Sequence, residues 1–329
     1  MCGIVGLFCK TPELEPRLGE LLGAMLAQMD SRGPDSAGVA FYREPAPSGW
    51  SKLVLYSADP EAAWDAVAGE LADAFGGAEV TDVRALHCVL LVEADAADAD
   101  AWVRRHRPDV RVMSAGRAIE IYKEVGRPRA FVEAFRLAEF DGTHGLGHTR
   151  MATESRVTTA GSHPFSTGYD VCLVHNGSLS NHNRLREELR REGIEFQTEN
   201  DTEVAAAYLS WRMREGASLE EGLEGCLADL DGFYTFLVGT ADGFAVLRDP
   251  IACKPAVLAE TDEWVAMASE YRALAVLPGA ADARIWEPEP RVVYAWDIGA
   301  ARGVDRQDGR ALPARPSEMT GRHAGAVNR

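Results

Sequence analysis

Met1-Cys2-Gly3-Ile4-Val5-Gly6 is the stretch that decides the fold, and it opens the chain. If the initiator methionine is removed, Cys2 carries a thiol and a free α-amine on one residue. A terminal amine can act as the base for its own side-chain nucleophile. Both groups titrate within reach of pH 7, at about 8 for the amine and about 8.5 for the thiol. The apolar run from Ile4 to Phe8 predicts a buried strand with this nucleophile at its tip. The alternative is a cysteine that follows the methionine by chance.

Length, charge and cysteine usage exclude several classes of protein. A chain of 329 residues is long enough for one large domain or two ordinary ones. The formal net charge of −17 argues against nucleic acid or an anionic membrane as a partner. The sequence shows no signal-peptide pattern and no apolar run near the roughly 20 residues that span a bilayer, so we expect a cytoplasmic protein. There is no Cys-x-x-Cys pair, which argues against a zinc site or an iron–sulfur cluster, and Cys88 and Cys172 lie in apolar runs typical of reduced core residues.

Residues from about 50 to 140 have the pattern of an insertion. Alternating strand and helix patterns in this range, ending in a helix predicted over 129–138, indicate a small α/β region. Before it, apolar residues at helical spacing predict a helix over 18–29. After it, a short strand is predicted over 171–174, followed by helices and then several short strands. Residues 301–329, rich in Arg, Gly, Pro and Ala, are expected to form a loose tail.

A cysteine that attacks an amide needs donors for the developing oxyanion and groups that hold the charged ends of its substrate. Asn176 and Gly177 can supply an amide N–H and a backbone N–H, but Asn-Gly alone more often marks a hairpin turn. Arg150 can bind a carboxylate through two hydrogen bonds and Asp201 can pair with an ammonium, or the two can be a surface ion and a helix N-cap. Arg32 can brace the N-terminal region or simply lie in a turn.

Five short motifs occur in a fixed order along the chain. They are Met-Cys-Gly-Ile-Val-Gly, Arg-Gly-x-Asp-x-x-Gly, Gly-His-Thr-Arg-x-Ala-Thr, His-Asn-Gly and Asp-Thr-Glu. Together they resemble the class II glutamine amidotransferases, a branch of the N-terminal-nucleophile hydrolases. Residues 248–255 and 268–274 are similar to two later segments of that family. The resemblance covers residues 1–35 and about 145–277. Each motif alone is weak, but the ordered set is very specific.

The resemblance implies a fold, a reaction and a role for each matching residue. The fold would be α+β, a four-layer αββα sandwich formed by residues 1–300 and interrupted by the small α/β insertion. The reaction would be hydrolysis of L-glutamine to L-glutamate and ammonia through a γ-glutamyl thioester, with no metal and no cofactor in this chain. The implied site residues are Cys2 as nucleophile with its α-amine as base, Asn176 and Gly177 as the oxyanion hole, Arg150 for the α-carboxylate, Asp201 for the α-ammonium, and Thr153 and Arg32 as residues that shape the pocket.

Some features depart from the best-known members of the family. Met151 follows Arg150 where the hexosamine-synthesising enzymes typically have Trp, which puts their ammonia gate in doubt. Only about 50 residues follow residue 277, too few for a synthase domain, so we expect the ammonia to pass to another subunit. Residues 114–126 resemble the amidotransferase subunit of glutamate synthase-like enzymes, including N-methylglutamate synthase. That narrower resemblance implies a role in nitrogen metabolism and a hetero-oligomer with a flavin-binding synthase subunit and a β-helix subunit.

Two other functions compete with an amidotransferase subunit. One is a self-sufficient amidohydrolase that acts on a γ-glutamyl compound and needs no partner. The other is a non-catalytic regulatory subunit with a vestigial Cys2 site, against which the intact motif set argues. The sequence leaves open the ammonia acceptor, the partner subunits, the oligomeric state, the role of the insertion and whether Met1 is removed.

Overall fold

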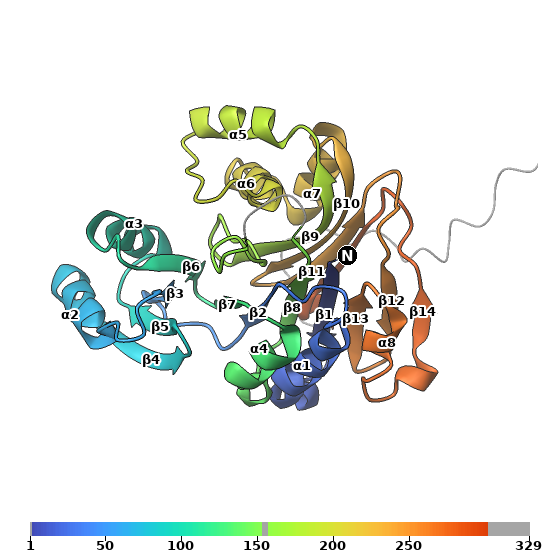
Figure 1. Cartoon of the computed structure of the whole chain (residues 1–329), viewed down its shortest axis with the longest axis horizontal. Helices are drawn as coiled ribbons and strands as arrows, with labels where there is room; N and C mark the ends of the chain where they lie inside the picture. The colour runs from blue at the N-terminus through green and yellow to red at the C-terminus, as the bar shows by residue number, and fades with distance from the viewer. Residues whose placement is uncertain (1, 153–156, 302–329) are drawn as a thin grey trace, which may run out of the picture.

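Two β-sheets face each other in the computed structural model, which describes residues 2–152 and 157–301. Helices cover the outer face of each sheet, so the layers run helix, sheet, sheet, helix (Figure 1). This is the α+β, four-layer αββα arrangement that the sequence predicted. Within the described ranges, no helix combines the length and the apolar character needed to cross a bilayer.

The larger sheet holds the N-terminal strand near its centre. Strand β1 (Gly3–Cys9) pairs antiparallel with β8 (His144–Arg150) on one side and with β13 (Trp264–Ala268) on the other. All residues of β1 are buried, as expected of an apolar strand that is covered on both faces. Across the sheet the strands lie in the order β14 (Arg284–Trp286), β12 (Val257–Glu260), β13, β1, β8, β2 (Ser36–Tyr42) and β7 (Ile119–Val125).

The smaller sheet packs face to face on the larger one. Its strands lie in the order β15 (Val293–Asp297), β11 (Gly243–Arg248), β10 (Gly232–Thr240) and β9 (Val171–Leu179). Leu237 approaches Gly6 so closely that a Cβ at Gly6 would lie 2.5 Å from its Cδ2 atom. Phe8 and Phe244 meet edge to face with their ring centroids 5.7 Å apart. These contacts pack β1 against the smaller sheet.

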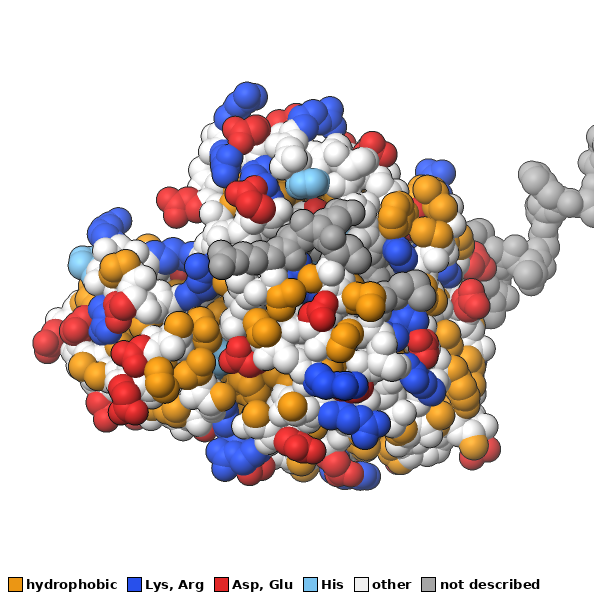
Figure 2. Space-filling view, viewed as in Figure 1, with side chains coloured by type: hydrophobic (Ala, Val, Ile, Leu, Met, Phe, Trp, Pro, Cys, Tyr) orange, Lys and Arg blue, Asp and Glu red, His pale blue; other side chains and the backbone are white. Residues whose placement is uncertain are grey.

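Amphipathic helices form the two outer layers. The larger sheet is covered by α1 (Leu18–Gln28), α4 (Pro128–Ala134) and the short α8 (Tyr271–Leu274). The apolar face of α1 is buried, as the spacing of its leucines and methionines predicted. The smaller sheet is covered by α6 (Asp201–Arg214) and α7 (Leu219–Asp229), and α5 (His182–Arg191) packs against α6. Arginine and glutamate side chains point to solvent from the outer face of α5, at the top of Figure 2. The short α9 (Ile298–Ala301) follows β15 at the end of the described chain.

The insertion folds as a separate layer pair, here called the inserted module (residues 51–116). Its elements are β3 (Ser51–Tyr56), α2 (Trp64–Phe75), β4 (Ala78–Arg84), β5 (His87–Val92), α3 (Ala96–His106) and β6 (Arg111–Gly116). The antiparallel strands lie in the order β4-β5-β3-β6, which is the ferredoxin-like βαββαβ arrangement. The module has its own apolar core and projects to the left of the sandwich in Figure 1.

The boundary of the separate sheet differs from the predicted range of about 50–140. Strand β7 belongs to the larger sheet, because Ile119 and Ile121 are buried there and the whole strand pairs with β2. The helix predicted over 129–138 is also interrupted. It ends at Ala134, Arg136 has a φ of 51°, and a short 3-10 helix follows. The expected tail lies outside the described residues from position 302 onward.

Two buried thiols confirm the prediction of reduced core cysteines. Cys88 lies in the core of the inserted module and Cys172 lies between the two sheets, and both are free thiols in the described part of the chain. Burial raises the pKa of each thiol to about 12. Neither group is therefore a thiolate near neutral pH.

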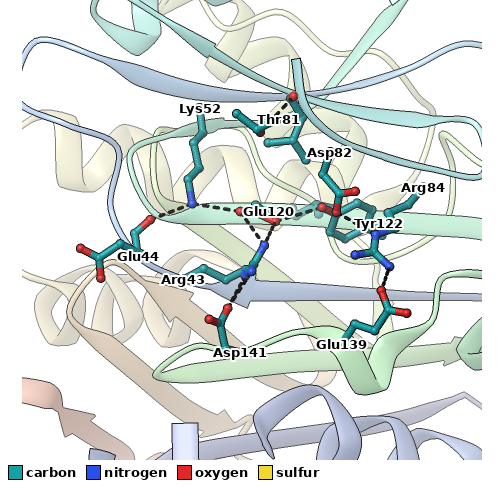
Figure 3. Close-up of polar contacts among 12 residues, drawn as sticks. Arg43, Glu44, Lys52, Thr81, Asp82, Arg84, Glu120, Tyr122, Glu139 and Asp141 are labelled. Carbon is teal, nitrogen blue, oxygen red and sulfur yellow. Dashed lines mark hydrogen bonds and ion pairs between the residues drawn. The ribbon is translucent and has the colours of Figure 1, made fainter. Parts of the chain in front are cut away.

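A buried cluster of charges joins the inserted module to the sandwich (Figure 3). Its centre is Glu120 on β7, whose side chain is 2% exposed. Its carboxylate accepts hydrogen bonds from Lys52 Nζ at 2.9 Å, Arg43 Nη1 at 3.2 Å and the Tyr122 hydroxyl at 2.9 Å. Lys52 comes from the module, whereas Arg43 and Glu120 come from the sandwich. The module is therefore tied to the larger sheet by charge as well as by chain connection.

Candidate active site

Cys2 lies at the tip of the central strand, as the sequence predicted. Strand β1 begins at the next residue, and Met1 lies outside the described residues. The Cys2 thiol is half-buried and accepts a hydrogen bond from the Met151 backbone N–H at 3.4 Å. The Cys2 carbonyl accepts from Arg32 Nε at 2.9 Å and from Asn176 Nδ2 at 3.3 Å. These contacts fix the position of the residue from which the thiol projects.

Asn176 and Gly177 lie inside a strand and do not form a hairpin turn. The prediction that the strand ends at Val174 was wrong, because β9 continues to Leu179 while its pairing with β10 is maintained. Gly177 has a φ of 152°, and a Cβ there would lie 1.9 Å from the Phe233 carbonyl oxygen. A glycine is therefore required for the strand to pass this point. Gly177 is exposed while Asn176 is 4% exposed.

The Asn176 amide is held between the two sheets. Its Nδ2 atom donates to Ser269 Oγ at 3.0 Å and to the Cys2 carbonyl at 3.3 Å. Ser269 Oγ also accepts from the Ile4 backbone N–H at 2.9 Å. The Oδ1 atom of Asn176 is buried and has no hydrogen-bond partner in the described part of the chain. Sequence reasoning missed the part played by Ser269, although this residue lies in segment 268–274, which carries part of the family resemblance.

Arg150 ends strand β8 and is almost completely buried, so it is not a surface ion. Its Nη1 atom donates to the Gly161 carbonyl at 3.1 Å. Burial lowers the pKa of Arg150, while Cys2, Asp35 and Asp201 act in the opposite direction. The guanidinium thus lies within electrostatic reach of both the thiol and the Asp201 carboxylate.

Asp201 is the first residue of α6, and it does not cap that helix. The capping residue is Asn200, whose Oδ1 accepts from the Thr202 backbone N–H at 2.9 Å. The Asp201 carboxylate instead accepts from the Leu179 backbone N–H at 3.0 Å, across the end of β9. The N-cap alternative for Asp201 was therefore wrong. Its side chain is 23% exposed and remains accessible to a ligand.

Arg32 lies against Cys2, so the turn alone does not account for it. Besides its contact with the Cys2 carbonyl, its Nη1 atom pairs with Glu270 Oε1 at 2.6 Å. Asp35, from the same loop, accepts from the Ala152 backbone N–H at 2.8 Å. Thr153 lies outside the described residues, so its predicted role is not addressed by the structure.

Three buried histidines lie behind the site residues. The rings of His148 and His163 stack with their centroids 3.9 Å apart. His148 Nε2 bonds the His175 carbonyl at 3.1 Å, and Thr202 Oγ1 lies 3.0 Å from His175 Nδ1 and 3.3 Å from His163 Nε2. Burial lowers the pKa of all three, so they are neutral near pH 7 and act as packing and hydrogen-bonding groups. Sequence reasoning assigned no role to these histidines. His148 and His175 lie in two of the quoted motifs, which is the signal that could have pointed to them.

Comparisons with known proteins identify relatives over most of this chain. A family model described as a glutamine amidotransferase domain matches residues 148–276, a range that includes Arg150, Asn176 and Asp201. The chain is 59% identical over 298 residues to the glutamine amidotransferase-like protein GlxB of Rhizobium meliloti (strain 1021), covering 90% of this chain and 98% of that protein. It is 33% identical over 290 residues to a putative glutamine amidotransferase of Methanothermobacter thermautotrophicus, covering 82% and 92%.

A solved structure supports the fold. Glutamine phosphoribosylpyrophosphate amidotransferase from B. subtilis, complexed with ADP and GMP, superimposes with a TM-score of 0.54 at 19% identity. The match covers 90% of this chain and 49% of that one, so this chain spans about half the length of that enzyme.

The arrangement of sheets, the cysteine at the tip of β1 and these relatives define the class: the chain belongs to the class II glutamine amidotransferases and is an enzyme of that class. Within the class, GlxB and the methanogen protein are two relatives that align over most of this chain.

Proposed function

We propose that this enzyme is an amidotransferase subunit that hydrolyses L-glutamine to L-glutamate and ammonia through a thioester on Cys2. The observation that carries the proposal is the convergence on one strand tip of Cys2, the Asn176 amide and the Arg150 guanidinium. The proposal assumes that Met1 is removed, so that Cys2 bears a free amine.

The first chemical step needs a base and an oxyanion hole. The α-amine of Cys2 takes the thiol proton, and Sγ attacks the γ-carboxamide carbon of glutamine. The amide oxygen then carries negative charge and accepts hydrogen bonds from Asn176 Nδ2 and the Gly177 backbone N–H. Both hydrogens on Asn176 Nδ2 are already engaged, with Cys2 and Ser269, so the oxyanion replaces one of these acceptors.

The second step releases the products. The tetrahedral intermediate collapses, the protonated amine of Cys2 returns its proton to the departing nitrogen, and ammonia leaves. Water then attacks the γ-glutamyl thioester, giving its proton to the α-amine. Glutamate leaves and the Cys2 thiol is restored, so the cycle needs no metal and no cofactor in this chain.

Substrate recognition is assigned to two charged groups. Arg150 binds the α-carboxylate of glutamine, for which its planar guanidinium is well suited. Asp201 pairs with the α-ammonium. Arg32 holds the Cys2 carbonyl and thereby the strand tip. Thr153, the last residue of the motif that contains Arg150, is proposed to shape the same pocket.

We further propose that the ammonia passes to a glutamate synthase-like partner in a hetero-oligomer, for synthesis of glutamate or N-methylglutamate in the cytoplasm. The resemblance of residues 114–126 to the stand-alone amidotransferase subunits supports this assignment. Flavin would reside in the partner.

The competing function is a self-sufficient amidohydrolase acting on a γ-glutamyl compound. Glutamine turnover that rises on addition of the partner favours the first, whereas steady turnover by the isolated chain favours the second.

The direct test is to measure glutamate and ammonia release by wild type, Cys2→Ala and Cys253→Ala. Cys253 is an exposed free thiol and serves as the matched control. We expect Cys2→Ala to abolish glutamine hydrolysis with the fold intact, and Cys253→Ala to retain it, because one thiol carries the covalent step. Full activity of Cys2→Ala, or of protein shown by mass spectrometry to retain Met1, would refute the mechanism.

A further inference from the structure

Lys123 is a buried cation that the mechanism above does not use. It lies on β7, the strand that follows the inserted module, and the residue is 4% exposed. Its ammonium donates to the backbone carbonyls of Ala160 at 3.2 Å, Ser162 at 2.9 Å and Pro164 at 3.1 Å. It also lies 4.7 Å from the centre of the Phe165 ring. One side chain therefore bonds three backbone carbonyls of a segment that has no regular secondary structure of its own.

That segment (residues 160–164) contacts the site through its second residue. Gly161 lies between the residues held by Lys123, and its carbonyl accepts from Arg150 Nη1 at 3.1 Å. The same carbonyl accepts from Asn200 Nδ2 at 3.3 Å, beside Asp201. The shape that Lys123 imposes on the segment thus sets the position of an acceptor for the Arg150 guanidinium.

We propose that Lys123 is a positioning residue for glutamine binding, acting through Gly161 to orient Arg150. The inference rests on the role proposed above for Arg150 in binding the α-carboxylate. Lys123 does not touch the substrate. Its effect is to fix the acceptor to which Arg150 Nη1 donates, and with it the orientation of the guanidinium.

A side chain that donates hydrogen bonds is needed at this position for a physical reason. Three backbone carbonyl oxygens point at the Lys123 ammonium, and an apolar side chain would leave them without this donor, which destabilises the conformation of the segment. Burial lowers the pKa of Lys123 to about 7, with Glu203 acting to raise it and Arg111 to lower it. A small cavity of about 30 Å³ adjoins Lys123 and is lined also by Arg111, Phe165 and Glu203, which leaves space for a longer side chain.

The test measures glutamine affinity by calorimetry in Cys2→Ala protein, and kcat and KM in protein that keeps Cys2. We expect Lys123→Met to raise the Kd and KM for glutamine at least tenfold while kcat changes less than threefold. Lys123→Arg should restore both constants to within threefold of wild type, because it keeps the charge and the adjoining cavity accepts its length. The matched control is Lys10→Met, which removes a cation paired with Glu260 at the far end of β1 and should leave glutamine affinity unchanged.

The step through Arg150 has its own test. In an Arg150→Lys background, Lys123→Met should raise the Kd for glutamine by less than threefold, since the group it orients is already altered. Equal tenfold losses in both backgrounds, or a Kd unchanged by Lys123→Met, would overturn the inference. If Lys123→Met does not fold, Lys123→Gln replaces it, with an expected rise in Kd of at least threefold, and an unchanged Kd again overturns the inference. Failure of the proposed function looks different, because Arg150→Lys alone would then leave the Kd unchanged.

Discussion

Asn176 lies in the smaller sheet and bonds Cys2 and Ser269 of the larger one. Its substitution distinguishes an effect on substrate binding from an effect on the chemical step. An oxyanion donor acts mainly in the transition state, so we expect Asn176→Ala to lower kcat for glutamine by about 10²–10³ with much less effect on KM. Steady-state kinetics with glutamine gives both constants. The control is Asn183→Ala on the exposed face of α5, which should leave both unchanged. A change confined to KM would reassign Asn176 to ground-state binding.

His87 is a buried residue whose ring has no hydrogen-bond partner among the described residues. It packs against the rings of Tyr56, Tyr122 and Phe135. Burial, with a smaller effect of Lys123, lowers its pKa to about 3. The unfolded chain binds a proton near pH 6.5, so stability from this group is present above that pH and is lost as pH falls toward 3.

His87→Phe should therefore make the protein less sensitive to acid. It removes no hydrogen bond seen in the described structure and leaves an aromatic ring among aromatic rings. Between pH 7 and pH 5 the wild type should lose about 2 kcal/mol more unfolding free energy than the variant. Urea unfolding at the two pH values measures this difference. Equal losses in both proteins would show that His87 is protonated in the native state or that its pocket opens.

At the scale of single elements, strand β7 joins the sandwich to the inserted module through Glu120. Removing one member of a buried charge cluster leaves the others unpaired, so Glu120→Gln should lower the unfolding free energy by about 3–5 kcal/mol. Asp141 is the matched control, because it also pairs with Arg43 but its side chain is 60% exposed. Asp141→Asn should cost about 1 kcal/mol or less. Similar losses for both variants in urea unfolding would show that burial of this cluster is energetically unimportant.

Elements with a strong local pattern were predictable from the sequence, and elements set by distant pairing were not. The helix α1 and the strand β1 follow from their apolar spacing. Strand β7 was assigned to the insertion because its neighbours in sequence lie there, whereas its pairing partner β2 lies on the other side of the insertion. Local sequence carries no information about such a pairing.

The contrast between local patterns and distant pairing also explains which parts of the candidate site were predictable from the sequence. Cys2, Arg150 and Asn176 were named because motifs point to them. The interior position of Asn176 in β9 depends on its register opposite Thr235, which no local turn signal reveals. The partner of Asp201 is the backbone of Leu179, so its local resemblance to a helix cap was misleading. Lys123 carries no motif, and its contacts arise only when residues 160–164 fold over β7.

At the scale of the whole molecule, the candidate site depends on both sheets at once. Cys2 and Arg150 come from neighbouring strands of the larger sheet, Asn176 comes from the smaller one, and Asp201 begins a helix of the outer layer. The site therefore cannot form before the two sheets pack. On the face shown in Figure 2, acidic and basic side chains are interspersed.

The position of the inserted module has a consequence for the order of folding. Strands β2 and β7 form an antiparallel pair, with Tyr42 opposite Ile119, so the module occupies the loop of a hairpin. Within the module, Lys52 lies opposite Gly116, so the chain leaves the module beside the point where it enters. A module that folds first reduces a loop of more than 70 residues to about ten, which lowers the entropic cost of closing the hairpin by about 2 kcal/mol. During synthesis the module also emerges before β7 and β8. It can therefore bring the end of β2 close to the start of β7 before β1 has paired with β8 and β13.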